Sequence, residues 1–185
     1  MGIDEKELKA LLERIDGGLD TEKTICLIGS GATMLLGQPA RGTGGIDIWA
    51  EASKITAPAF RVAIEGAGLQ YDPKAEFPSL PYVQIIHPGI VQVPGFDPLR
   101  RRWFKRPEQI VWRGGKLTVT CPPGEALIAS KLMRGSDRDL EDCLWIIASQ
   151  RLSAAAIIKA IKMLPPQARA EADANFEILN LTKPR

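Results

Sequence analysis

The residues best suited to chemistry lie close together in the sequence, between residues 24 and 51. An apolar run over 24–28 predicts a buried strand, which leads into a turn of Gly29, Ser30 and Gly31 and a short helix over 31–36. A turn at the start of a helix presents backbone N–H groups that bind anions such as phosphate, and glycine lets an anion approach the backbone closely. A tight strand-to-helix turn without a ligand is the alternative, and it is favoured for these three residues alone.

Asp47 is the sharpest candidate for a metal ligand or a catalytic group. It lies in an apolar stretch over 46–50 that predicts a strand, and the alternation of Ile46 and Ile48 places Asp47 on the opposite face. A carboxylate with poor solvation needs a metal or hydrogen bonds. An exposed aspartate on an edge strand is the alternative, and the site interpretation is favoured over it. Residues i and i+2 share a face, so an acid at position 45 would complete a two-metal pair; that position is Gly45.

The pattern from residue 29 to residue 47 resembles the nucleotidyltransferase fold, and most closely the AbiEii-like toxins and their uncharacterised relatives. The resemblance implies that the turn, with Arg41 and Thr43, binds the triphosphate of an NTP and that Asp47 coordinates Mg²⁺ and acts in catalysis. It also implies a third carboxylate from a later strand, where Gln84 stands; Asp72 or Glu76 could replace the missing acids. The residues in register are Gly29, Ser30, Ala32, Arg41, Thr43, Ile46 and Asp47.

A second match to the same family lies in the C-terminal part of the chain. There Lys131-Leu is followed by Arg138-Asp139-x-x-Asp142, as in the K-L and R/K-D-x-x-D motifs of AbiEii-like proteins. The resemblance implies that Lys131 faces the triphosphate as a catalytic cation and that Arg138 and Asp142 belong to the nucleotide-binding site. The alternative is a solvated network of ion pairs on helix surfaces, each worth about 0.3–0.5 kcal/mol.

The periodicity predicts a mixed α/β (α+β) fold with a C-terminal helical subdomain, and the resemblance implies that the α/β part is a nucleotidyltransferase-like mixed sheet flanked by helices. A composition change after residue 122 divides the chain into an α/β core over 1–122 and a helical subdomain over 123–185. Strands are also predicted over 82–86, 90–93, 109–112 and 116–120, and helices over 4–16, 57–66, 123–133, 137–149, 153–163 and after Pro165-Pro166.

Composition narrows the function classes only slightly. The net charge of +2 says little about partners, and a single histidine with three widely spaced cysteines argues against a zinc site and favours reduced, buried thiols. No apolar run reaches the length of about 20 residues that spans a bilayer, so we expect a cytoplasmic protein without membrane contact. The run from Arg100 to Arg106 mixes cations with aromatics, which suits an RNA acceptor, although a solvated loop is the commoner explanation.

Three functions compete on these observations. The first is a nucleotidyltransferase, such as a toxin that modifies RNA or protein and pairs with an antitoxin. The second is a catalytically inactive relative that binds a nucleotide or a partner protein, which Gly45 and Gln84 favour. The third, a Rossmann-like dinucleotide binder, is rejected because Met34 occupies the third glycine position and the intervening helix is too short for a crossover.

Overall fold

The computed structural model describes residues 2–39, 41–55, 57–74, 81–104 and 106–181. The chain forms two compact units. Unit 1 comprises residues 1–87 and 108–121, and unit 2 comprises residues 88–107 and 122–185. Residues 88–107, which the sequence pattern places with the N-terminal part, thus group with the C-terminal helices.

Unit 1 begins with the amphipathic helix α1 (Glu5–Gly17), which the apolar spacing predicts. Asp4 caps it, because its Oδ1 accepts a hydrogen bond from the Glu7 backbone N–H at 2.8 Å. The buried face matches the predicted stripe and carries Leu8, Leu11, Leu12 and Ile15. The burial of this face fixes α1 to the rest of the unit.

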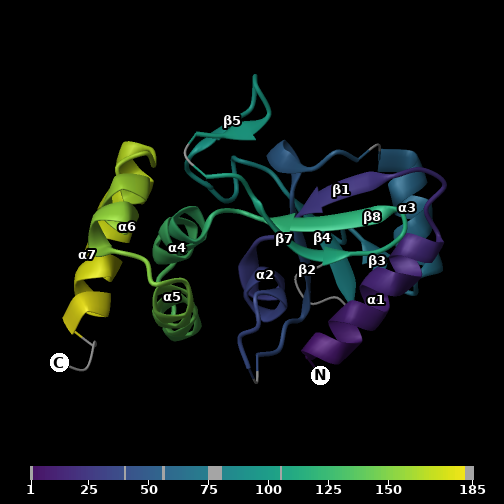
Figure 1. The fold of residues 1–185 in the computed structure, drawn as a ribbon, viewed down its shortest axis with the longest axis horizontal. Helices are drawn as coiled ribbons and strands as arrows, with labels where there is room; N and C mark the ends of the chain where they lie inside the picture. The colour runs from purple at the N-terminus through teal and green to yellow at the C-terminus, as the bar shows by residue number, and fades with distance from the viewer. Residues whose placement is uncertain (1, 40, 56, 75–80, 105, 182–185) are drawn as a thin grey trace. The chain divides into compact units, whose positions relative to one another are not determined.

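Two three-stranded sheets form the centre of unit 1 (Figure 1). In the first, β8 (Leu117–Cys121) lies between β1 (Lys23–Cys26), to which it is parallel, and β7 (Gln109–Arg113), to which it is antiparallel. In the second, β4 (Tyr82–Ile86) lies between β2 (Gly45–Trp49) and β3 (Gln70–Tyr71), and both pairs are parallel. The mixture of parallel and antiparallel pairs, with helices between the strands, confirms the predicted α/β fold class.

The two sheets meet where the chain leaves β1. Leu27 forms an isolated antiparallel bridge with Ile48 of β2, and the Ile28 N–H donates to the Asp47 carbonyl oxygen at 3.0 Å. The chain then enters the short helix α2 (Gly29–Leu35), while η1 (Ala50–Ala52) and α3 (Ala57–Gly66) follow β2. This junction places the predicted turn beside the predicted acidic strand.

Asp16, near the end of α1, secures the β7–β8 hairpin. Its carboxylate accepts the backbone N–H groups of Gly115 at 3.0 Å, Lys116 at 2.7 Å and Leu117 at 2.6 Å. Burial acts to raise the pKa of Asp16, but these donors and the Lys116 charge outweigh it and hold the pKa below its usual value. The acid is therefore charged when it holds the hairpin at neutral pH.

In the described residues of unit 2 there are a short hairpin and four helices. The hairpin pairs β5 (Phe96–Asp97) antiparallel with β6 (Arg102–Trp103). Helix α4 (Gly124–Leu132) packs against the three helices that follow it. Those helices are α5 (Asp137–Gln150), α6 (Ala154–Ile161) and α7 (Pro166–Leu181).

The prediction for residues 88–107 is wrong in one element. Residues 90–93 do not form a strand; Ile90 is 67% exposed, and the pairing falls instead on residues 96–97 and 102–103. Pro88 and Pro94 flank the apolar run and offer no N–H to a ladder, which explains the failure. The observed strands have two residues each, too short for a periodic pattern to reveal.

The remaining predicted elements are present, with bounds shifted by one or two residues at most sites. The three cysteines are buried and unbridged, as predicted. Among the residues that the structure describes, no helix combines the length and apolar character needed to cross a membrane.

Candidate functional site

Gly29 and the carboxylate of Asp47 lie in direct contact in unit 1. Gly29 has a φ of +66°, and an ideal Cβ on it would lie 2.5 Å from Asp47 Oδ2. The Ile28–Asp47 hydrogen bond and the Leu27–Ile48 bridge hold the two segments in this register. Glycine is required here for two reasons, the left-handed backbone and the space that the carboxylate occupies. The turn and the acid that the sequence singles out are therefore side by side.

The contact predicts the effect of a single methyl group at residue 29. Gly29→Ala should lower the free energy of unfolding by more than the about 1–2 kcal/mol that a left-handed alanine costs, because the Cβ also displaces Asp47. Gly68→Ala is the matched control, since Gly68 has a φ of +81° but nothing within 4 Å of its ideal Cβ. Urea denaturation of both variants measures the difference, and equal losses would show that the Asp47 contact contributes nothing.

Tyr82 fills the position at which a second acid would stand. Gly45 and Tyr82 are register partners in the parallel β2–β4 pair, and an ideal Cβ on Gly45 would lie 2.4 Å from Tyr82 Cε2. Burial, and then the charge of Asp47, raise the pKa of Tyr82, so its hydroxyl stays protonated at neutral pH. The sequence analysis did not identify Tyr82. The signal that could have found it is its position two residues before Gln84, which places an aromatic ring opposite Gly45 once β4 is paired with β2.

Gln84 lies opposite Asp47 in the same register, and both side chains are partly exposed. Residues paired in parallel strands point to the same face, so the amide of Gln84 and the carboxylate of Asp47 share one face of the sheet. Gln84 can supply an oxygen ligand but no charge. The residue at which the resemblance implies a third acid is therefore neutral, although it lies opposite Asp47 on the same face of the sheet.

This face suits one divalent cation better than two. Among the described residues, no three His, Cys, Asp or Glu side chains cluster as a metal site, and Tyr82 occupies the space beside Gly45. A two-metal pair, which needs bridging acids, does not fit these residues. Mg²⁺ held by one carboxylate and by substrate phosphates does fit, because Mg²⁺ commonly keeps water as its other ligands.

Of the two acids suggested as replacements, the structure describes Asp72 alone. Asp72 directly follows β3 and links it to β4, because its Oδ1 accepts the Ile85 backbone N–H at 3.1 Å. Glu76 lies outside the described residues.

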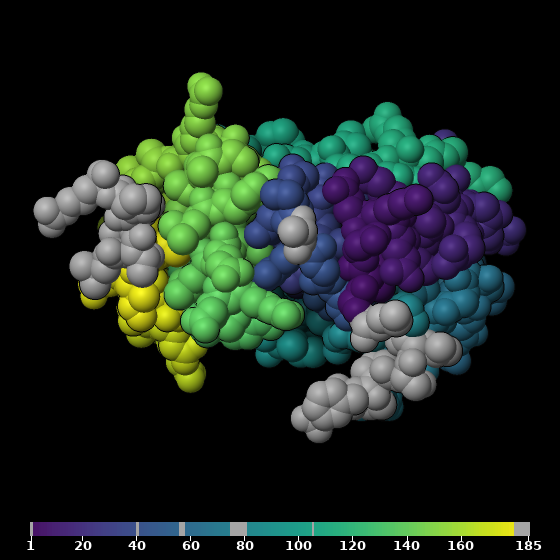
Figure 2. Space-filling view, turned by 90° about the horizontal axis from the view of Figure 1, so that it is seen from below, coloured from purple at the N-terminus to yellow at the C-terminus, as the bar shows by residue number. Residues whose placement is uncertain are grey.

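Thr43 and Arg41 lie on the segment that leads into β2. The Thr43 hydroxyl donates to the Gly45 carbonyl oxygen at 2.7 Å, and the Thr43 backbone pairs with Ile3. Arg41 lines a groove of about 700 Å³ with Gln38 and charged residues of α1, on the face of unit 1 where purple α1 lies beside the indigo segment (Figure 2). A phosphate contact by either side chain stays a prediction of the family resemblance.

Lys131, the predicted catalytic cation, is buried in an ion cluster within unit 2. Its side chain is 4% exposed, and Nζ lies 2.6 Å from Asp142 Oδ2 and 3.7 Å from Asp139 Oδ1. Arg134 binds the Asp139 carboxylate through two nitrogens, at 2.6 and 2.8 Å. The cluster joins α4 to α5, and it is more buried than the solvated network considered as an alternative. Arg138 is exposed on α5.

Asp139 of this cluster is charged at neutral pH. Burial acts to raise the pKa of Asp139, but hydrogen bonds from Arg134 and Ser136 and the charge of Lys131 outweigh it and hold the pKa below its ordinary value. A depressed carboxyl pKa contributes stability above the pKa of the unfolded chain, and this contribution is lost as the pH falls through the folded-state pKa.

Comparison with known protein families gives a match over most of the chain. A family model described as "Nucleotidyltransferase of unknown function (DUF6036)" matches residues 6–170 of the chain. The match covers most of both units. The searches of curated proteins and of solved structures give no match.

Proposed function

Because the chain belongs to the DUF6036 family of nucleotidyltransferases of unknown function, we propose that it binds a nucleoside triphosphate as its Mg²⁺ complex in unit 1. The observation that carries the proposal is the contact between the Asp47 carboxylate and the Gly29 backbone, 2.5 Å from the ideal Cβ position. A phosphate-accepting turn and a metal-binding acid are the two parts that such a ligand needs.

Each part of the site has a distinct task in this proposal. The backbone N–H groups of Gly29, Ser30 and Gly31 bind phosphate oxygens, and the Ser30 hydroxyl adds a further donor. Asp47 coordinates Mg²⁺, which neutralises the phosphates when bound. Gln84, which shares the face of Asp47, orients a water ligand or the ribose. The nucleotide contacts that the family resemblance assigns to Arg41, Thr43, Lys131, Arg138 and Asp142 stay predictions.

Isothermal titration calorimetry with each NTP and Mg²⁺ tests the proposal. Asp47→Asn keeps the size of the side chain and removes its charge, and we expect it to weaken binding at least about tenfold, as changes around metal ligands do. Asp20→Asn removes an exposed acid from the same unit and should leave binding unchanged. Failure of every NTP to bind the native chain, or equal binding by the two variants, would contradict the proposal.

The position of the Tyr82 ring favours a binding function without two-metal transfer. A second acid at residue 45 is sterically excluded by Tyr82, and Gln84 brings no charge. We therefore infer that the native chain holds Mg²⁺·NTP without transferring its nucleotidyl group. An assay with α-labelled NTPs and total cellular RNA or protein should show no labelled product; robust labelling by the native chain would rule out this inference.

The alternative is that the chain acts as a toxin similar to the AbiEii-like toxins and pairs with an antitoxin. A toxin of this type depends on turnover, so its effect on cells should require Asp47. Induced expression of the native chain should leave growth unchanged if the function is binding. Growth arrest by the native chain, with recovery in Asp47→Asn, would support the toxin function instead.

A further inference from the structure

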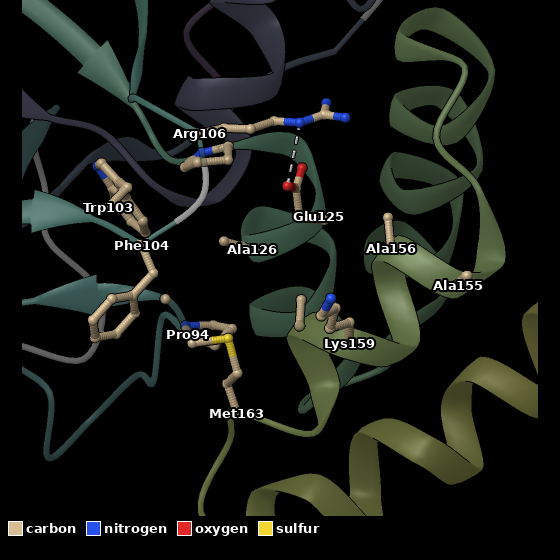
Figure 3. Close-up of a pocket in the computed structure, with 13 residues that line it drawn as sticks. Pro94, Trp103, Phe104, Arg106, Glu125, Ala126, Ala155, Ala156, Lys159 and Met163 are labelled. Carbon is tan, nitrogen blue, oxygen red and sulfur yellow. Dashed lines mark ion pairs between the residues drawn. The ribbon is translucent and has the colours of Figure 1, made fainter.

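Unit 2 contains a cavity of about 370 Å³ that is not part of the candidate site in unit 1 (Figure 3). Its volume lies within the range of small-ligand pockets, about 300–1,000 Å³. The residues around β5 and β6 form one side, and α4, α6 and the turn after α6 form the other. All the lining residues that the structure describes belong to unit 2, so the cavity is a property of this unit alone.

The space in the cavity comes from the distribution of large and small side chains on α6. Its large residues Ile157 and Ile161 are fully buried, whereas Ala155, Ala156 and Ala160 line the cavity. Residues four apart lie on one face of a helix, so Ala156 and Ala160 form a continuous wall of small side chains. A methyl group fills little of the volume beside a helix, and the cavity occupies the remainder.

Phe104 and Met163 give the cavity a second apolar wall, and Figure 3 shows both toward one end, away from Arg106. The Phe104 N–H donates to the Gly95 carbonyl oxygen at 2.8 Å, which fixes its backbone, yet the residue is 59% exposed. Met163 Cε lies 3.8 Å from the ideal Cβ position of Gly95, and Met163 is 41% exposed. Large apolar side chains that stay exposed around a cavity mark a binding surface.

Lys159 supplies the cation that is available to a ligand. It lines the cavity from α6 and is exposed, and no acid among the described residues forms an ion pair with it. Arg106, the other lining cation, lies 3.7 Å through Nε from Glu125 Oε1 (Figure 3). Two cations and the single acid Glu125 give the described lining a net charge of 2 − 1 = +1. The lining therefore attracts a monoanion.

We propose that this cavity binds a small organic monoanion with an apolar body, of the class of the apolar carboxylates. The apolar body fills the space between the alanine wall of α6 and the side chains of Phe104 and Met163, where its burial provides most of the binding free energy. The carboxylate stays at the open side, within reach of the Lys159 ammonium. A nucleoside triphosphate does not suit this cavity, because its several negative charges face a lining with a net charge of +1. The inference goes beyond the proposed function and does not depend on it.

Fluorescence titration of the full chain with two dyes tests the proposal. Anilinonaphthalene sulfonate has an apolar aromatic body and one negative charge, and phenylnaphthylamine is the same body without the charge. We expect the native chain to bind both. Lys159→Gln should weaken binding of the sulfonate about fivefold, the upper value for an exposed ion pair, and leave binding of the neutral dye unchanged. Phe104→Ala should weaken both dyes, and Ala156→Phe, which places a ring in the cavity, should abolish binding of both.

Lys162→Gln is the matched control, since Lys162 is an exposed cation at the end of the same helix but does not line the cavity. It should bind both dyes as the native chain does. Naphthoate, an apolar carboxylate, should displace the sulfonate dye, and Mg²⁺·ATP should not. No binding of either dye by the native chain, equal effects of Lys159→Gln and Lys162→Gln, or displacement by Mg²⁺·ATP would overturn the proposal. The dye titrations contain no nucleotide, so their outcome is independent of the calorimetric test of the site in unit 1.

Discussion

Asp142→Ala is expected to lower the free energy of unfolding by about 3–5 kcal/mol, the usual cost of removing one partner from a buried ion pair. Asp142 is fully buried, and its carboxylate lies 2.6 Å from Lys131 Nζ, which is itself 4% exposed. The ammonium would then keep only Asp139, at 3.7 Å, as an acidic neighbour in the described cluster. Hydrogen–deuterium exchange of peptides from α4 and α5 in the full chain measures the loss.

Two further variants distinguish the loss of the ion pair from a nonspecific loss of stability. Asp173→Ala removes an exposed acid of α7 and should change stability by no more than about 0.5 kcal/mol. The double variant Lys131→Met with Asp142→Leu replaces both charges by apolar groups and should recover much of the loss. If Asp142→Ala were as stable as Asp173→Ala, the described burial of Lys131 would be wrong.

The second large effect is a gain of nucleotidyl transfer when Gly45→Asp is combined with Tyr82→Ala. Removal of the ring frees the space beside residue 45, and a carboxylate there would share a face with Asp47. Two acids two residues apart could hold a pair of metal ions about 3.5–4 Å apart. Because metal ions supply several kcal/mol of transition-state stabilisation, we expect labelled product at about a hundredfold or more above the background seen with the native chain.

The single variants decide whether Tyr82 is the obstacle. Gly45→Asp alone should show little gain, because its Cβ would lie 2.4 Å from the ring. Tyr82→Ala alone should show none, since it adds no acid. Transfer by Gly45→Asp alone at the level of the double variant would show that the ring moves aside freely, and equal inactivity of all variants would show that the acid pair is not the missing part.

Most elements of the fold could be predicted from the sequence because they are long and strongly periodic. The apolar stripe of α1 has helical spacing, the strand before Gly29 is a continuous apolar run, and serine caps mark the starts of α5 and α6. The two-residue strands β3, β5 and β6 could not be predicted, because pairing with a neighbour defines them and their own composition does not.

The candidate site also has residues that could be predicted from the sequence and one, Tyr82, that could not. Gly29 and Asp47 could be selected because a turn motif and an isolated acid in an apolar strand are local signals. The obstruction by Tyr82 depends on the register of β2 and β4, which are separated in the sequence by α3 and β3.

Paramagnetic relaxation with Mn²⁺ in place of Mg²⁺ tests the central claim most directly. In the ¹⁵N-labelled full chain with the NTP that binds most tightly, Mn²⁺ should broaden the amide resonances of Gly29, Ser30, Gly31 and Asp47 before those of other residues. Asp47→Asn should abolish this selective broadening. Selective broadening elsewhere in the chain, with residues 29–31 and 47 unaffected, would contradict a metal–nucleotide site at this turn.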